Sequence, residues 1–291
     1  MISNMHDLSS LINDLGAKKG LVFRGHASAK WMLKPTLLRN DDGLKVDVHA
    51  QLERFRKYII GKIDNIKEYS DSEVWAVGQH YGLKTPMLDW TVSVGVALFF
   101  ALSEDSGSEE FSPILYALDA EKLNESYCRH IYREIEKIEP LVSEAFRKDL
   151  TNEGWKGKIL IEGNQEQTVA TNPISKAFGI VSKKTELERV RMFSPKRFFS
   201  GRIIGQRGLF TYSLSRLAID EILQKQSQSD LLTRYMISPD LKSEALTFLD
   251  AMNVNYMTIY PDVSGAAQYA NSKLRYYKKN TPVDNSSRYW L

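Results

Sequence analysis

The chain has 291 residues, a formal net charge of +3, 43% hydrophobic residues and 26% charged residues. This composition is ordinary for a globular protein with a sizeable core, and it excludes a disordered or low-complexity chain. A single cysteine excludes an internal disulfide framework, and with only five histidines it argues against a zinc site, so we expect no metal and an inert thiol at Cys128.

The longest apolar run, residues 94–102, is far shorter than a membrane span. The N-terminus also lacks a basic stretch followed by an apolar one, which a secretory signal would show. We therefore expect no membrane association and a cytoplasmic location.

Hydrophobic spacing predicts helices and short strands in the N-terminal part of the chain. In chain order we expect a helix at 7–15, a strand at 20–23, a helix at 44–67, a helix at 73–82 capped within 70–72, a strand at 87–90 and an apolar helix at 94–102. Arg24 then lies at the end of the first strand, and Ser93 or a neighbour begins the apolar helix.

The rest of the chain continues this mixture without an internal repeat. We expect an exposed loop at 103–112, a strand at 113–118, helices at 119–126 and 129–151, a region at 152–195 broken by prolines, strands at 202–204 and 208–212 around a bend at 206–208, helices at 215–226 and 240–252, and strands near 232–238 and 256–260. This order predicts an α+β fold in one elaborated domain over residues 1–291.

Polar residues that could form a site gather just before the apolar helix. His80, Asp89, Trp90, Thr91 and Ser93 lie within fourteen residues. Hydroxyl groups at positions i and i+2 of a strand point the same way, and a following helix start offers free backbone N–H groups to a ligand. Alternatively, Thr91 or Ser93 only caps the helix.

Two further positions could contact a ligand. Arg24 is followed by Gly25, where a ligand could approach the backbone while the guanidinium holds a phosphate or a ribose edge. The alternative for Arg24 is an internal ion pair. Gln206, between Arg202 and Arg207, could orient a ribose hydroxyl or hold a turn.

Basic residues are concentrated in two segments, where they could attract a nucleic acid. For contact with RNA or DNA we select Arg189, Arg191, Arg197 and Arg207. A second cluster interleaves tyrosines with cations, as in single-strand binders, and consists of Lys273, Arg275, Lys278, Lys279, Tyr269, Tyr276 and Tyr277. Solvated charged faces are the alternative for both segments.

Four motifs in this order resemble the FRG domain family, which is named for its Phe-Arg-Gly triplet. They are Phe23-Arg24-Gly25 followed by Trp31, Leu33, Pro35 and Arg39, the segment 80–102, the pattern Arg202-x-x-x-Gln206-x-Gly208-x-Phe210, and Tyr260-Pro261-Asp262-x-x-Gly265. The resemblance implies one FRG-type domain and a setting in prokaryotic conflict systems, with an antitoxin or chaperone partner.

More distantly, the chain resembles the mono-ADP-ribosyltransferase superfamily. Arg24 matches the arginine of that superfamily's arginine-serine-glutamate branch, the segment 91–93 matches its Ser/Thr-x-Ser, and the segment 97–101 matches its Ala-x-x-Phe-Ala helix. This resemblance implies a small mixed or antiparallel β core decorated by helices, NAD as the substrate, and catalytic roles for Arg24, Thr91, Ser93 and Gln206.

The third position departs from the superfamily, because Gln206 stands where a glutamate is usual. An amide can bind a ribose hydroxyl but cannot stabilise a cationic transition state as a carboxylate does, nor accept a proton. Three alternatives follow. Either the transfer of ADP-ribose is slower, or another acid such as Glu221 or Asp262 takes part, or the protein binds the nucleotide without turning it over.

We therefore expect NAD to bind with its pyrophosphate near Arg24 and Gly25 and its nicotinamide ribose between Ser93 and Gln206. Tyr81, Trp90 and Phe210 are candidates for stacking on nicotinamide, with a core role as the alternative. His80 is a candidate proton shuttle, with a structural histidine as the alternative. The ADP-ribose acceptor is RNA, DNA or protein.

The sequence is also compatible with two other classes of protein. One is a nucleic-acid-binding or nucleolytic module, in which His80 and Asp89 would be the acid and the base. The other is a sensor or scaffold of a defence system.

Overall fold

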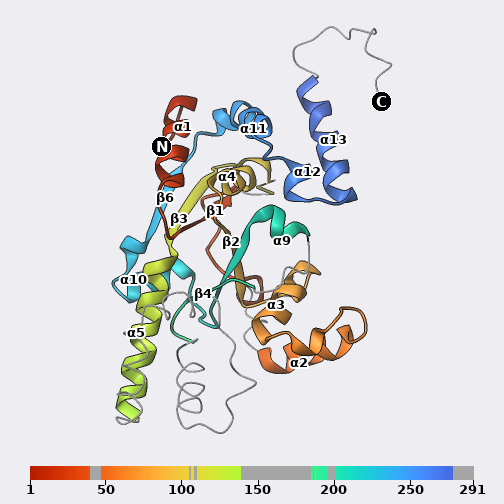
Figure 1. Ribbon diagram of the computed structural model, residues 1–291. Coiled ribbons are helices and arrows are strands. Elements are labelled where there is room, and N and C mark those ends of the chain that lie inside the picture. Colours follow the sequence, from red (N-terminus) through yellow and green to blue (C-terminus); the bar gives the residue numbers. More distant parts are fainter. Residues whose placement is uncertain are drawn as a thin grey trace.

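The computed structural model describes residues 1–39, 47–104, 106–107, 110–138, 185, 187–195 and 201–277. Its centre is a six-stranded antiparallel sheet with the strand order β4-β5-β2-β1-β3-β6 (Figure 1). The strands are β1 (Leu21–His26), β2 (Met87–Thr91), β3 (Ile114–Asp119), β4 (Arg191–Phe193), β5 (Gly208–Tyr212) and β6 (Leu232–Met236). The predicted α+β class is confirmed, and the β core is antiparallel.

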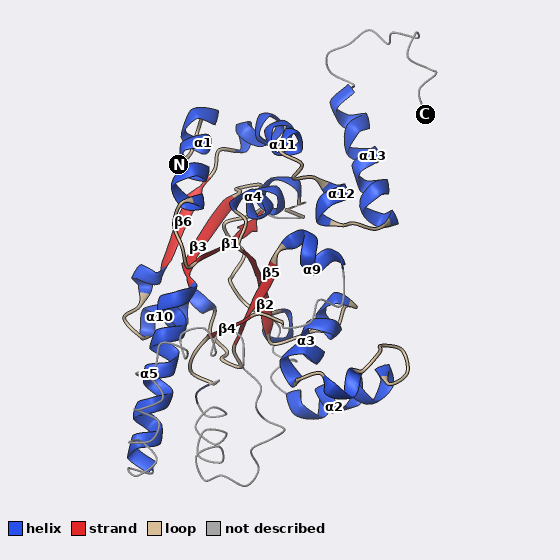
Figure 2. Cartoon of the chain, viewed as in Figure 1, coloured by secondary structure: helices blue, strands red, loops and turns tan. Residues whose placement is uncertain are grey.

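Helices surround this sheet, as Figure 2 shows. They are α1 (Met5–Gly16), α2 (Val48–Ile59), α3 (Asp71–His80), α4 (Val94–Ser103), α5 (Ala120–Ile138), α9 (Gly201–Gln206), α10 (Ile219–Lys225), α11 (Lys242–Ala251), α12 (Tyr256–Ile259) and α13 (Val263–Tyr277), with short 3-10 turns at Thr36–Leu38, Ile66–Glu68, Ser229–Leu231 and Pro239–Leu241. None of the described helices combines the length and the apolar character needed to cross a bilayer.

One face of the sheet is covered by α5 and α10. Because side chains alternate along a strand, Val22, Leu88 and Tyr116 all point to this face. They pack there with Leu123 of α5 and Ile222 of α10. This layer forms one continuous part of the core.

The opposite face carries two separate apolar clusters. Over β1 and β3, Phe23 and Leu115 pack under α1, α4 and α11. Over β2 and β5, Met87 and Phe210 pack under α2 and α3, with Tyr212 beside them. Between these two clusters lie Arg24, Asp89 and Thr91 of the sheet.

Most predicted elements exist, and several boundaries are corrected. The helix predicted at 44–67 ends at Ile59, and Gly61 follows with a φ of 77°. The two helices predicted at 119–126 and 129–151 are one helix, α5, as far as Ile138, and residues 139–151 lie outside the described residues. Of the region 152–195, the structure describes residue 185 and residues 187–195, which include β4.

Two predicted strands are wrong, because both segments are helical. Residues 202–204 belong to α9, in which Ile203 is buried and Ile204 is exposed. Residues 256–259 form α12, since the Asn255 side chain accepts hydrogen bonds from the N–H groups of Met257 and Thr258. The β-branched residues favoured strands, but capping and packing against neighbouring helices decided the conformation.

Candidate functional site

The strands β1 and β2 pair at one position and then separate. Phe23 is registered with Thr91, and continued pairing would bring Gly25 opposite Asp89. Instead, the side chain of Arg24 enters the gap, and its Nη1 donates to the Asp89 carbonyl oxygen at 2.6 Å. A side chain thus replaces a backbone hydrogen bond in the middle of the sheet.

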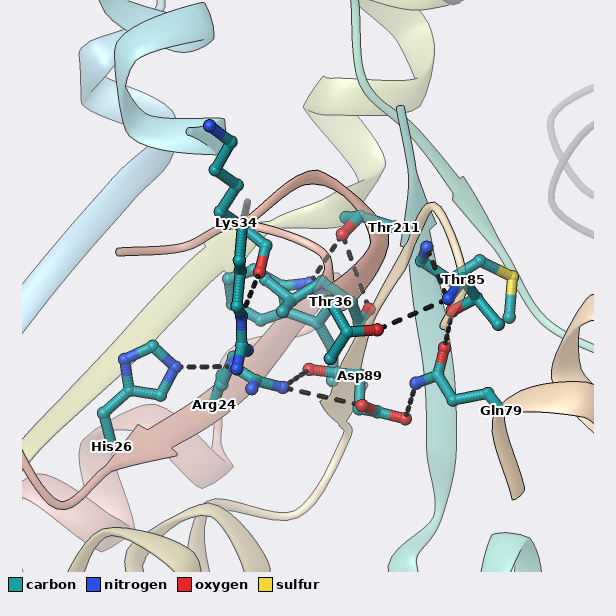
Figure 3. A network of polar contacts seen from close by, with 12 residues as sticks. Arg24, His26, Lys34, Thr36, Gln79, Thr85, Asp89 and Thr211 are labelled. Atoms are coloured by element: carbon teal, nitrogen blue, oxygen red, sulfur yellow. Dashed lines mark hydrogen bonds and ion pairs between the residues drawn. The ribbon is translucent and has the colours of Figure 1, made fainter. Parts of the chain in front are cut away.

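The Arg24 guanidinium is held from two sides (Figure 3). Its Nε donates to Nε2 of His26 at 2.8 Å, and its Nη1 lies 3.8 Å from the Asp89 carboxylate. Only 18% of the Arg24 side chain is exposed. No hydrogen bond within the described residues engages Nη2, so the fork is oriented and keeps donors for a ligand.

His26 is a neutral acceptor for this arginine. Burial among other side chains, and secondarily the positive charge of Arg24, lower the pKa of His26 to about 3, against a smaller opposing effect of the Trp31 backbone. The imidazole therefore stays unprotonated near neutral pH, and its Nε2 lone pair remains available to Arg24.

Asp89 connects Arg24 to α3. Its carboxylate accepts a hydrogen bond of 2.6 Å from Nε2 of Gln79, and the Oε1 of Gln79 accepts one from the Thr85 hydroxyl (Figure 3). The Thr85 N–H in turn donates to the Thr36 hydroxyl at 3.3 Å. This chain of hydrogen bonds ties the strand gap to the loop between α3 and β2 and to the 3-10 turn at Thr36–Leu38, and so limits the movement of Asp89.

A cavity of about 300 Å³ opens beside the gap, between the two apolar clusters of this sheet face. That volume is at the lower end of those that hold small ligands. The walls come from β1, β2, β5, α3, α4, α9 and the residue after α12. The residues that line it are Phe23, Arg24, Gly25, Ala76, Gln79, His80, Asp89, Trp90, Thr91, Ala97, Phe100, Glu104, Arg202, Ile203, Gln206, Gly208, Phe210 and Tyr260.

Glu104 adds a carboxylate to the cavity at the C-terminal end of α4. Within the described residues its side chain makes no hydrogen bond or ion pair. Desolvation by burial raises the pKa of Glu104, although the nearby charge of Arg24 opposes this. The carboxylate therefore stands near the arginine without being bound to it.

Arg202 supplies a second cation from α9. Its Nε and Nη2 both lie 2.8 Å from one carboxylate oxygen of Asp262, and its guanidinium lies 5.2 Å from the Tyr260 ring centre. Asp262 also accepts a hydrogen bond from the Gly265 N–H at the start of α13. The Tyr-Pro-Asp motif thus orients an arginine at the wall of the cavity.

The structure brings most of the predicted site residues to this cavity. Those that line it are Arg24, Gly25, His80, Trp90, Thr91, Gln206 and Phe210. Ser93 and Tyr81 are not among the lining residues, and Tyr81 is 69% exposed. His80 and Asp89, which the nuclease alternative pairs, also line the cavity, and burial followed by the charge of Arg202 lowers the pKa of His80.

Several of these residues have clear structural tasks. Ser93 is the N-cap of α4, accepting from the Val96 N–H, and the Thr91 hydroxyl accepts from the Ser93 N–H at 3.0 Å. The indole of Trp90 is buried and donates to the Thr211 hydroxyl. Phe210 is buried and stacks on Phe193. Ser93 therefore caps α4, and Trp90 and Phe210 belong to the core, as the alternative interpretations of these residues predicted.

Gly25 is needed for packing. A Cβ atom at this position would lie 1.9 Å from the Ala97 carbonyl oxygen and 2.6 Å from the Ala101 nitrogen. The glycine of the Phe-Arg-Gly triplet thus lets α4 approach β1 closely, and this helix brings Ala97, Phe100 and, just after its end, Glu104 to the cavity.

Gln206 ends α9 and faces the cavity with its amide unengaged by other described residues. Arg207 follows with a φ of 47° and is exposed, and Gly208 then starts β5 opposite Thr91. The sequence predicted a bend at 206–208 between two strands. The bend exists, but it joins the helix α9 to the strand β5.

The predicted nucleic-acid-binding arginines lie in different places. Arg191 is opposite Tyr212, and its guanidinium lies 4.7 Å from that ring, at the end of β5 remote from Gly208. Arg189 donates to Gln226 beyond α10. Arg197 lies outside the described residues, as do Lys278 and Lys279. Of the four selected arginines, Arg207 directly follows a cavity residue.

The sequence interpretation missed Glu104 and the site role of Arg202. Glu104 is the second residue of the segment 103–112, whose polar composition predicted an exposed loop. A charged residue directly after an apolar helix was the available signal, since it lies where the helix leaves the core. Cys128 is partly buried, and burial raises the pKa of its thiol to about 12, in accord with an inert thiol.

The fold and the site define an α+β protein with a polar cavity in a split antiparallel sheet. The FRG domain model matches residues 19–110, which supports the resemblance to the FRG family. The matched segment runs from β1 past the end of α4 and includes Arg24, Asp89 and Glu104, but not Gln206. No curated protein and no solved structure matches the chain.

Proposed function

We propose that this protein binds NAD in the cavity and transfers its ADP-ribose to an acceptor. The observation that carries the proposal is Arg24, fixed in the strand gap by His26 and by the Asp89 carbonyl with donors to spare. An oriented guanidinium beside a cavity suits a phosphate or ribose oxygen.

The residues of the cavity fit parts of NAD. A volume of about 300 Å³ suits the nicotinamide and its ribose, with the adenosine half outside. Arg24 and Arg202 are two cations for the pyrophosphate. The amide of Gln206, which no described residue engages, suits a ribose hydroxyl, as the sequence interpretation expected, while Ser93 is engaged as the cap of α4.

The proposed reaction breaks the bond between C1′ of the ribose and N1 of nicotinamide. The electron pair of that bond leaves with nicotinamide, which becomes neutral, and a nucleophilic atom of the acceptor bonds to C1′. The proton displaced from the acceptor passes to a base of the protein and then to water. The chain therefore has to orient the ribose, stabilise positive charge at C1′ and accept one proton.

Incubation with NAD labelled in the adenylate moiety tests this function. We expect release of nicotinamide, transfer of label to an acceptor, and a rise in the melting temperature with millimolar NAD that exceeds the rise with ATP. A melting curve unchanged by NAD but shifted by an RNA or DNA oligomer would support the nucleic-acid-binding module instead.

For the acceptor we propose a single-stranded nucleic acid, which Arg207 would hold next to Gln206. Arg207→Glu should lower labelling of the strand about tenfold or more and reduce its salt dependence between about 50 and 200 mM, with NAD binding unchanged. Arg191→Glu is the matched control, because that side chain lies over Tyr212 at the other end of β5. Salt-insensitive labelling of protein alone, equal in both variants, would contradict a nucleic-acid acceptor.

A role as a toxin or effector in a prokaryotic conflict system, in the cytoplasm and under control of an antitoxin or chaperone, is part of this proposal. It is supported by the resemblance to the FRG family over residues 19–110.

A further inference from the structure

The cavity contains two carboxylates, and they differ in how they are bound. Asp89 is tied to Gln79 and faces Arg24, and 56% of its side chain is exposed. Glu104 has no bond to another described side chain and is more deeply placed at the end of α4. A carboxylate held in a cavity without a fixed partner remains available to a ligand.

Charged and titratable groups face Glu104 from several elements. Arg24 of β1 attracts it, Asp89 of β2 repels it, and Arg39 contributes a weaker attraction. Tyr260 lines the same cavity, and its pKa is raised to about 12 by burial first and then by the charge of Glu104. His80 and Arg202 line the same cavity.

The other acids considered for this site are engaged elsewhere. Asp262 binds Arg202 through two nitrogens and caps α13. Glu221 accepts a hydrogen bond of 2.7 Å from the Ala218 N–H and so caps α10. Neither residue lines the cavity.

We propose that Glu104 is the catalytic carboxylate of this site. It performs the task that the mono-ADP-ribosyltransferase superfamily gives to a glutamate at the position where this chain has Gln206. It stabilises positive charge at C1′ and accepts the proton of the attacking nucleophile. The proposal rests on the proposed function, since it assigns the base of that same reaction. The assignment also explains how the site could be catalytic although its third expected position holds the amide of Gln206 and not an acid.

Glu104→Gln tests the assignment through turnover. We expect NAD turnover to fall about 100-fold or more, with the rise in melting temperature caused by NAD retained. Glu104→Asp should recover part of the turnover. The control is Glu110→Gln, an exposed acid of the same segment that does not line the cavity.

The pH profile separates catalysis from a structural effect. The pKa of Glu104 is raised above its ordinary value of 4.5, so wild-type turnover should rise with pH as the carboxylate ionises in the window above about 4.5. The residual turnover of Glu104→Gln should lack that rise.

Stability provides a readout that does not depend on turnover. Because burial favours the protonated acid, the folded state binds this proton more tightly than the unfolded state, and ionisation above about pH 4.5 lowers the free energy of unfolding. Glu104→Gln removes that penalty, so its melting temperature should exceed that of the wild type near pH 7. The two melting temperatures should converge below about pH 4.5.

The outcomes distinguish the two proposals. If wild type releases nicotinamide and Glu104→Gln does so equally fast, the assignment of Glu104 is overturned and the transferase proposal stands. If wild type releases no nicotinamide and binds no NAD, the proposed function itself fails, and the catalytic role of Glu104 fails with it.

Discussion

Arg24→Lys is expected to lower NAD turnover by about 100-fold or more, the size of loss seen when one preorganised donor is removed from a charge-stabilising site. A lysine keeps the positive charge, but its donors all lie on one nitrogen, so it cannot reproduce the separate contacts of Nε with His26 and Nη1 with the Asp89 carbonyl while Nη2 faces the ligand. Steady-state release of nicotinamide measures the effect.

The same variant should remain folded. The loss of the bond to His26 costs about 1 kcal/mol, which a thermal melt would register as a shift of a few degrees. Arg234→Lys is the matched control, because Arg234 pairs with Asp220 at 2.6 Å and does not line the cavity. A folded Arg24→Lys variant with wild-type turnover would show that Arg24 only joins the strands.

Gly25→Ala is expected to destabilise the fold by about 3 kcal/mol or more, because the new Cβ would lie 1.9 Å from a backbone oxygen of α4. A backbone atom cannot relieve the clash by changing rotamer as a side chain can, so α4 would have to shift away from β1. Urea unfolding followed by circular dichroism measures the loss.

Gly95→Ala is the matched control on the same helix. Its Cβ would meet Val254 at 3.4 Å, which is ordinary contact, and alanine favours a helix over glycine. This variant should be as stable as wild type or slightly more stable. Equal stability of Gly25→Ala and wild type would contradict the packing role of the triplet glycine.

Local sequence determined much of the sheet and of the helices beside the cavity. The apolar run after the cap residue Ser93 predicted α4, and the short apolar run before Arg24 predicted β1. These signals depend on residues near each other in the chain, since caps and apolar spacing act within a few residues. The same local signals placed the end of the first strand at Arg24, and this was wrong, because pairing with β3 continues β1 as far as His26 and leaves Arg24 in its interior.

Contacts between distant segments decided the rest. Whether residues 202–204 and 256–259 were strands or helices depended on packing, such as the close approach of Gly205 to the Thr258 carbonyl, where a Cβ would lie at 2.4 Å. Likewise, the basic residues near 190 and near 207 are close in sequence, but they reach opposite ends of β5.

The composition of the cavity is the clearest case of a property that only the tertiary structure determined. The sequence predicted Arg24, Thr91, Ser93 and Gln206 as residues of one site, and all of them except Ser93 line the cavity. It could not show that β1 and β2 separate after one pair, that Gly25 admits α4, or that Glu104 therefore reaches the same space. The polar segment around Glu104 predicts an exposed carboxylate. Its partial burial results from the packing of distant segments, which is a property of the assembled fold.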